Sequence, residues 1–147
     1  YSTPPSGVAT AGGVDLAALG AAKKFFSSAR RLKGAGSVTI LATALKGRGV
    51  AMDADVGEDI GGVANMFVNF EREIAARGVF PAIDFSRSYT KRAESFQTEE
   101  EQRCAFALRN IASGKFGAEH VRELLSKTKT NEEFIARSVL WSGAVKE

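Results

Sequence analysis

The stretch that decides how this chain folds is Gly78-Val-Phe-Pro-Ala-Ile-Asp-Phe-Ser-Arg-Ser-Tyr-Thr-Lys-Arg92. Its first half, from Val79 to Phe85, is apolar apart from Asp84, and such a run is typical of a buried strand. A polar segment follows it and carries three cations: Arg87, Lys91 and Arg92. The stretch therefore predicts a buried strand that delivers a charged loop to the surface of the protein.

The size and composition of the chain fit one folded domain. It has 147 residues, of which 44% are hydrophobic and 25% charged, so it can bury a core and is not expected to be disordered. The net charge of +3 and the pI near 9.2 are compatible with nucleic-acid binding, although many proteins that bind no polyanion have a similar balance.

Cysteine and histidine are too few to form a metal site. The chain has one of each, Cys104 and His120, which excludes an internal disulfide and a set of zinc or iron–sulfur ligands. Cys104 is expected in the core and His120 at or near the surface. We therefore predict no metal, no cofactor and a reducing compartment. No apolar run approaches the roughly 20 residues of a membrane-spanning helix, and no signal segment opens the chain at Tyr1, where upstream residues are expected to be missing.

A loop and a helix are predicted for the amino-terminal part. Residues 1–14 are rich in Ser, Thr, Pro and Gly. Asp15 is a good N-cap for a helix to about Leu32, because apolar residues recur there at helical spacing. The opposite face carries cations that fit a solvated surface, which is the commoner case, or an RNA contact: Lys23, Lys24, Arg30 and Arg31.

A parallel sheet is predicted for the middle of the chain. Val38 to Leu45 is a nearly continuous apolar run, typical of a strand covered on both faces. Lys46 and Arg48 follow at its carboxyl end, the edge at which open α/β sheets bind ligands. The next elements are expected to be a glycine-rich loop or broken helical turn over 57–64, a strand over 65–70, a short helix over 71–77 and the strand over 79–85.

A helical tail is predicted from residue 93 onward. Two capping boxes, Thr98 to Glu101 and Thr130 to Glu133, open helices with apolar stripes. The whole chain, 1–147, is thus predicted to be one α/β domain, with a loop over 1–14, an α/β part over 15–92 and helices over 93–147.

Several short motifs follow one another in a fixed order along nearly the whole chain. They are Gly12-Gly-Val-Asp15, Lys24-Phe-Phe26, Ser37-Val-Thr-Ile-Leu-Ala-Thr-Ala-Leu45, Val79-Phe-Pro-Ala-Ile-Asp84 with Ser86-Arg87-Ser88, and Thr128-Lys-Thr-Asn131. Together they resemble the carboxyl-terminal part of the ATPase domain of the bacterial transcription termination factor Rho, a hexameric RNA translocase. The resemblance implies the second half of a RecA-like domain of the P-loop NTPase type, with a partial, mostly parallel sheet and flanking helices.

The resemblance also implies functional positions, and the sequence departs from the family at several of them. The family's arginine finger, in Gly-Thr-Arg, corresponds to Lys91, with Arg92 and Arg87 nearby. A lysine does not reproduce the forked guanidinium on a phosphate. A second, nucleotide-facing arginine corresponds to Gly78.

The pore positions of the family differ as well. Its two RNA-gripping lysines correspond to Val8 and Ala51. The candidates left for RNA binding are Lys46, Arg48, Lys23, Lys24, Arg30 and Arg31. No residue is predicted to be catalytic. No Gly-x-x-x-x-Gly-Lys-Ser/Thr motif occurs, so the chain alone is not expected to be an enzyme, and an upstream half would reopen that question.

Three hypotheses about function follow. The favoured one is a catalytically silent, Rho-derived module in a larger ribonucleoprotein, such as a ribosome in the matrix of a mitochondrion or plastid, with RNA as a ligand and other protein subunits covering the exposed side of its sheet. The alternative is the carboxyl-terminal part of an active Rho-type, homohexameric, RNA-dependent ATPase that terminates transcription in the bacterial cytoplasm. The third is a protein-interaction domain without RNA contacts.

Overall fold

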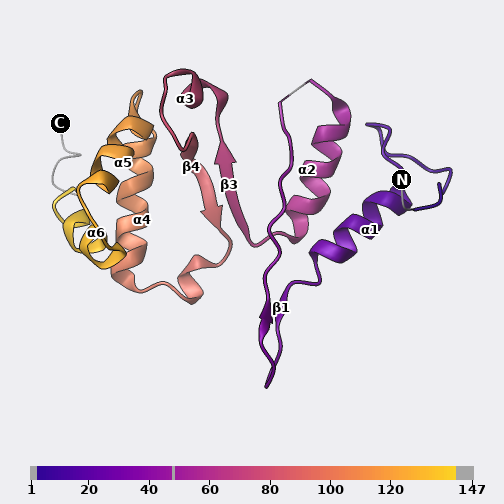
Figure 1. Ribbon diagram of the computed structural model, residues 1–147, viewed down its shortest axis with the longest axis horizontal. Helices are drawn as coiled ribbons and strands as arrows, with labels where there is room; N and C mark the ends of the chain where they lie inside the picture. Colours follow the sequence, from indigo (N-terminus) through magenta and orange to yellow (C-terminus); the bar gives the residue numbers. More distant parts are fainter. Residues whose placement is uncertain (1–2, 48, 142–147) are drawn as a thin grey trace. The chain divides into compact units, whose positions relative to one another are not determined.

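The computed structural model describes residues 3–47 and 49–141, and the chain divides into two compact units between Ala64 and Asn65 (Figure 1). The first unit contains helices α1 (Leu16–Phe26) and α2 (Ala51–Val63) and the strands β1 (Arg30–Arg31) and β2 (Ser37–Val38). The second contains the strands β3 (Met66–Phe70) and β4 (Ile83–Thr90), the 3-10 helix η1 (Ala93–Ser95), and the helices α3 (Arg72–Ala76), α4 (Glu99–Ala112), α5 (Gly117–Ser126) and α6 (Asn131–Ser138).

Asp15 organises the start of the first unit. Its carboxylate accepts hydrogen bonds from the amides of Ala17 at 2.8 Å and Ser6 at 2.7 Å, which confirms the predicted N-cap of α1 and ties down the preceding loop. The hydrogen bond from the Ser6 amide is the main cause that lowers the pKa of Asp15. α1 ends at Phe26, earlier than predicted, because the chain turns at Ser28, whose amide and hydroxyl both donate to the Phe25 carbonyl.

The predicted parallel sheet is wrong for the part of the chain that the structure describes. The chain is a mixed α/β protein, but β1 pairs with β2 and β3 with β4, both antiparallel. Only Val38 of the predicted strand over 38–45 lies in a strand, while Leu41 is 95% exposed and Leu45 65%. A strand needs a neighbour for its amides and carbonyls. None of the described strands pairs with residues 39–45, so an apolar, β-branched composition alone does not make this segment a strand.

The glycine-rich segment 57–64, predicted to be a loop or a broken helical turn, is not a loop, because residues 57–63 continue the regular helix α2. α2 packs against α1 within the first unit, and the Gly12 amide donates to the Asp55 carboxylate at 2.8 Å. Lys23 of α1 forms an ion pair with Asp59 at 3.0 Å. These contacts hold a helix whose glycines would weaken it in isolation.

The substitution Gly62→Ala is expected to raise the free energy of unfolding by about 0.5 kcal/mol, because alanine loses less backbone entropy in a helix. Apart from its chain neighbours and the backbone of its own helix, a Cβ at Gly62 meets no atom within 4 Å. Urea unfolding of the native protein measures the effect. Gly12→Ala is the control and is expected to have the opposite effect. Its Cβ would lie 2.7 Å from the Ala51 carbonyl carbon, so this variant is expected to be less stable than the wild type. A Gly62→Ala variant less stable than the wild type would contradict the helical assignment.

The second unit confirms the predicted strand and short helix that begin it, β3 and α3, but shifts the next strand. β4 begins at Ile83 instead of Val79 and continues through Thr90, across the segment that was predicted to be a loop. Val79, 5% exposed, and Ala82, 9% exposed, instead enter the core of this unit with Ile74 and Ala118. The chain before β4 is therefore buried through its side chains without being a strand.

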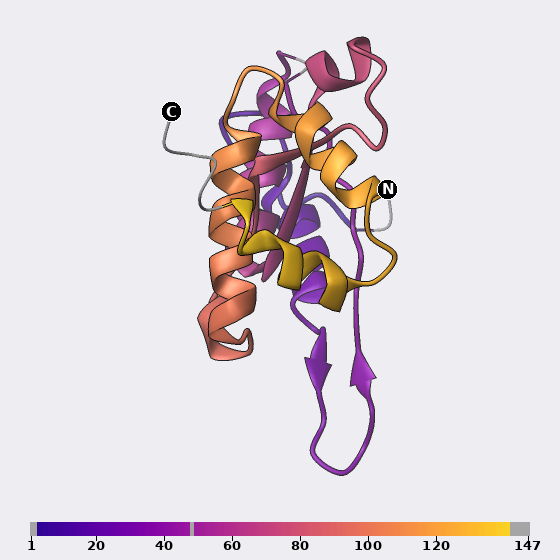
Figure 2. The same ribbon diagram turned by 90° about the vertical axis from the view of Figure 1, so that its left-hand side faces the viewer.

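The helical tail agrees with the prediction. Thr98 and Glu101 form the complete capping box of α4. At α6 the Thr130 hydroxyl accepts from the Glu133 amide, while the Glu133 carboxylate accepts from the Lys129 amide. α4 packs against β4, α5 and α6 (Figures 1 and 2). Cys104 is buried and His120 exposed, as expected.

Candidate functional sites

Asp84 shapes the segment that carries the predicted charged residues. Asn69 pairs with Asp84 and Phe67 with Tyr89, so four residues of β4, 85–88, stand opposite the single residue Val68 of β3. The Asp84 carboxylate holds this bulge, because it accepts from the Ser86 amide at 2.9 Å and hydroxyl at 2.5 Å. The sequence motif of Asp84 and Ser86 therefore encodes a bulge in a strand, not the predicted free loop.

Arg87 lies at the bulge and is held by carboxylates. Its Nε lies 3.3 Å from Asp84 Oδ2 and its Nη1 3.4 Å from Glu71 Oε2, although the side chain remains 71% exposed. Exposed pairs of this kind are worth little energy, so the guanidinium can exchange them for an anion at small cost.

The surroundings of Asp84 lower the pKa of its carboxyl group. Partial burial acts to raise it, and the hydrogen bonds from Ser86 and Arg87 outweigh burial, so the pKa lies below its ordinary 3.8. A carboxyl with a lowered folded-state pKa contributes stability that is present above its unfolded pKa and is lost as the pH falls through the folded value.

The variant Asp84→Asn is expected to reduce the loss of stability below about pH 4, because it removes this one titration. Urea unfolding at a series of pH values measures the difference between variant and wild type. Ser86→Ala removes a donor and is expected to have a smaller effect in the same direction. Identical pH profiles for Asp84→Asn and the wild type would show that the hydrogen bonds of Asp84 do not favour its charged form.

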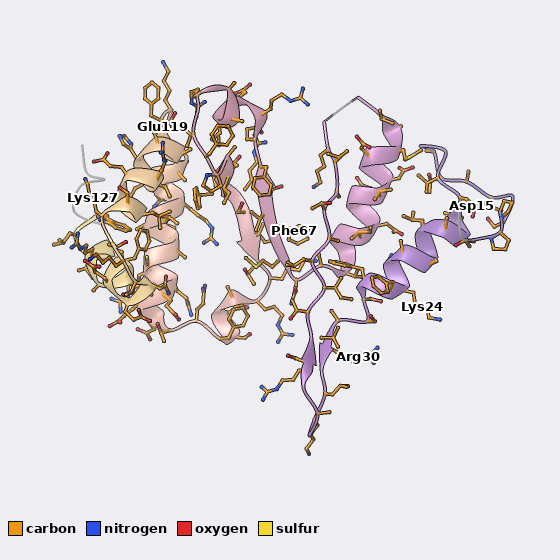
Figure 3. All side chains as sticks on the ribbon, in the orientation of Figure 1. Asp15, Lys24, Arg30, Phe67, Glu119 and Lys127 are labelled. Carbon is orange, nitrogen blue, oxygen red and sulfur yellow. The ribbon has the colours of Figure 1, made fainter. Side chains whose placement is uncertain are left out.

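Lys91, the residue predicted to take the finger position, belongs to an aromatic cluster. Phe67 and Tyr89 stand opposite each other in the β3–β4 ladder, and their rings stack with centroids 4.8 Å apart. Lys91 Nζ lies 5.3 Å from the Phe67 ring centroid, within the range of a cation–π interaction. Its amide also donates to the Asn65 carbonyl at 2.8 Å. The cluster fixes where the Lys91 stem leaves the strand (Phe67 is labelled in Figure 3).

Arg92 turns the chain out of β4. Its φ of 54° and ψ of 35° place it in the left-handed region, and it is the N-cap of η1. Non-glycine residues adopt this conformation at a cost. Arg92 is exposed and follows Lys91 directly, so two cations emerge together at this corner.

Gly78, predicted from the resemblance to take a nucleotide-facing position, offers no side chain and has a φ of 75°. The neighbouring Arg77 does not replace it, because its Nε donates to the Glu119 carboxylate of α5 at 2.7 Å. This hydrogen bond is the main cause that lowers the pKa of Glu119 and raises that of Arg77. Arg77 therefore joins α3 to α5.

The RNA-binding candidates of the first unit have different surroundings. Lys23 is half-buried and paired with Asp59. Lys46 is exposed, but its side chain passes close to Gly57 of α2, where a Cβ would lie 3.3 Å from Lys46 Cε. Arg48 lies outside the described residues.

The remaining candidates lie at the end of α1 and in the hairpin that follows. Lys24, Arg30 and Arg31 are exposed, and the β1–β2 hairpin brings Lys33 into the same group. Figure 3 labels Lys24 and Arg30. Sequence reasoning missed three neighbours of the predicted sites: Lys33, Phe67 and Tyr89. The spacing of Tyr89 and Lys91 by two residues was a signal for one face of a strand.

Metal and membrane features are not found in the described part of the chain. Residues 3–47 and 49–141 contain no group of three or more potential metal ligands among His, Cys, Asp and Glu. None of the helices in these ranges combines the length and apolar character that crossing a membrane requires.

Comparison with known proteins gives a consistent result. No protein-family model matches the chain. Transcription termination factor Rho of Haemophilus influenzae is 42% identical over 135 residues, which make up 90% of this chain and 32% of that protein. Rho of Salmonella typhimurium is 42% identical over 139 residues, with coverages of 91% and 33%. Rho of Bacillus subtilis is 41% identical over 133 residues, with coverages of 89% and 31%.

These relatives correct one prediction and support another. All three come from bacteria, so the predicted location in a mitochondrial or plastid matrix is wrong. The chain spans about a third of the length of the curated relatives that it matches. Over about nine tenths of its own length, the chain is a relative of the transcription termination factor Rho, as its motifs indicated.

Proposed function

We propose that this chain is the carboxyl-terminal part of a Rho-type, RNA-dependent ATPase that terminates transcription. The observation that carries the proposal is 41–42% identity to Rho proteins of three bacteria over about nine tenths of the chain. Identity at this level, spread over both units, supports the alternative hypothesis over an organellar ribonucleoprotein subunit.

In this proposal the chain supplies cations to a site completed by another subunit. Phosphoryl transfer depends mainly on charges placed around the phosphates, and a cation from a neighbour stabilises the charge of the transition state. Lys91 and Arg92, exposed at the end of β4, are the residues proposed for this role. The P-loop and the Mg²⁺-binding carboxylate of the family would come from the part of the protein that precedes this sequence.

RNA-stimulated ATP turnover by the native protein tests the proposal. We expect turnover that depends on RNA, and that falls when Lys91 and Arg92 are both replaced by alanine. Turnover without RNA dependence would contradict the termination-factor function. A protein that binds RNA and ATP without any turnover would favour a different candidate.

That second candidate is a catalytically silent, Rho-derived subunit that binds RNA or supports an assembly. Four positions favour it, because lysine replaces the finger arginine at Lys91 and uncharged residues replace cations at Gly78, Val8 and Ala51. Loss of charge at positions predicted to contact phosphate, while the rest of the sequence is retained, is expected of a protein that has kept the fold and lost the activity.

A further inference from the structure

Positive charge is strongly segregated along this chain. The segment from Leu16 to Met52 contains seven of the 20 Lys and Arg residues and none of the 17 Asp and Glu residues. The remainder of the chain is therefore net negative, with 13 cations against 17 carboxylates. A net charge of only +3 conceals this local excess, which is the pattern of a polyanion-binding element.

The β1–β2 hairpin presents part of this charge on an exposed turn. Arg30 pairs with Val38 and Arg31 with Ser37, and Lys33 lies at the turn, where Gly34 has a φ of 77°. All residues from 30 to 39 are exposed, and both views show the hairpin reaching away from the helices of its unit (Figures 1 and 2). Among the ion pairs of the described residues, none involves Arg30, Arg31 or Lys33.

An exposed aromatic ring stands at the base of the hairpin. Phe25, near the end of α1, is 69% exposed and lies next to Lys24. The turn between α1 and β1 joins it to the hairpin, because the Ser28 hydroxyl donates to the Phe25 carbonyl at 2.7 Å and Arg30 Nε donates to the Ser28 carbonyl at 3.1 Å. A flat apolar ring and a guanidinium are thus held within one short turn.

We propose that the β1–β2 hairpin, together with Phe25, is a binding element for single-stranded RNA. Arg30, Arg31 and Lys33 contact backbone phosphates, and Phe25 stacks on a base. Cations that follow the backbone beside an aromatic platform are the usual means of binding single strands without sequence preference. The element is separate from the pore loops that the family resemblance implies, and the proposed function enters only in the choice of RNA as the nucleic acid.

An acidic protein segment is the competing ligand, and the structure favours RNA over it. A carboxylate-rich peptide would pair with the three cations equally well, but it has no base that could stack on the exposed Phe25 ring. The glycines at the tip, Gly34 and Gly36, carry no side chain, so a backbone of phosphates and sugars can approach closely.

Binding of a fluorescein-labelled oligouridylate to the native protein tests the proposal. The triple variant Arg30→Ala/Arg31→Ala/Lys33→Ala is expected to bind at least about tenfold more weakly at low salt. The slope of log K against log salt concentration should fall by about 2, because each phosphate contact to a single strand contributes about 0.7. Phe25→Ala is expected to weaken binding roughly 5- to 150-fold with little change in this slope.

Matched controls separate the site from bulk charge and from unfolding. The variant Lys115→Ala/Lys127→Ala/Lys129→Ala removes the same charge from the second unit, and Phe70→Ala removes a ring that is 70% exposed, as Phe25 is 69% exposed. Both controls are expected to bind as the wild type does. The double variant Arg30→Lys/Arg31→Lys retains the charge and is expected to retain the salt slope. That result would show that RNA binding depends on the positive charge of the hairpin.

Three results would overturn the proposal. The first is unchanged RNA binding by the hairpin triple variant, and the second is an equal loss in the two triple variants. The third is loss of affinity for an acidic peptide with RNA binding intact, which assigns the hairpin to a protein ligand. ATP turnover that continues with wild-type RNA binding in the hairpin variant would reject this element and leave the proposed function standing. RNA binding that depends on the hairpin, in a protein without ATP turnover, would support this element and reject the proposed ATPase function.

Discussion

Replacement of Phe134 by alanine is expected to lower the free energy of unfolding by about 3–5 kcal/mol, the usual cost of deleting a buried aromatic side chain. Phe134 is 7% exposed on α6, which packs against α4. Its ring meets that of Trp141 edge-on, with centroids 4.8 Å apart at 69°. The loss combines burial of the ring with this aromatic contact, and urea unfolding of the native protein measures it.

Phe106→Ala is the matched control for Phe134. Phe106 is a phenylalanine of the same helical group, on α4, but it is 66% exposed, so its removal is expected to cost less than about 0.5 kcal/mol. Equal losses for the two variants would show that α6 is not docked through Phe134. Val139, the C-cap of α6, is 72% exposed, so the apolar burial of this helix rests mainly on Phe134.

The elements that were predictable from sequence are those whose signals are local. Asp15 and Thr98 cap helices because each side chain bonds to amides within three residues of itself, and this geometry needs no other part of the chain. The assignment of Lys91 to the family's finger position also rests on a short motif, and it stays a prediction. Cys104 was assigned to the core from the apolar stripe of its own helix.

The errors concern pairing, which depends on distant residues. Val38 to Leu45 has the composition of a strand, but a strand is made by its neighbours, and the described strands do not pair with residues 39–45. The bulge at Asp84 turns a predicted loop into a strand, because Ser88 donates to the Asp84 carbonyl and accepts from the Asn69 amide. The Phe67–Tyr89 stack could not be predicted from the sequence, because it depends on the register of two strands and no short motif specifies that register.

Replacement of Lys91 by alanine is expected to lower the RNA-stimulated ATP turnover of the native protein at least about a hundredfold, if the chain acts as proposed. A finger cation contributes about 10³ to 10⁵ in rate to related phosphoryl transfers, and a lysine supplies its charge without the fork. Arg92→Ala, measured beside it, shows which of the two adjacent cations reaches the phosphate. Lys127→Ala, far along the sequence on the turn after α5, is the control and should leave turnover unchanged.

The variant Lys91→Arg separates a catalytic role from a structural one. Arginine retains the charge over the Phe67 ring, where Lys91 Nζ now lies 5.3 Å from the centroid, so the free energy of unfolding should change little. Its planar guanidinium adds two-point contact with a phosphate, so turnover should rise above that of the wild type. Wild-type turnover in both Lys91→Ala and Arg92→Ala would exclude this corner of β4 from the reaction. Loss of stability in Lys91→Ala without loss of turnover would assign Lys91 to its aromatic cluster alone.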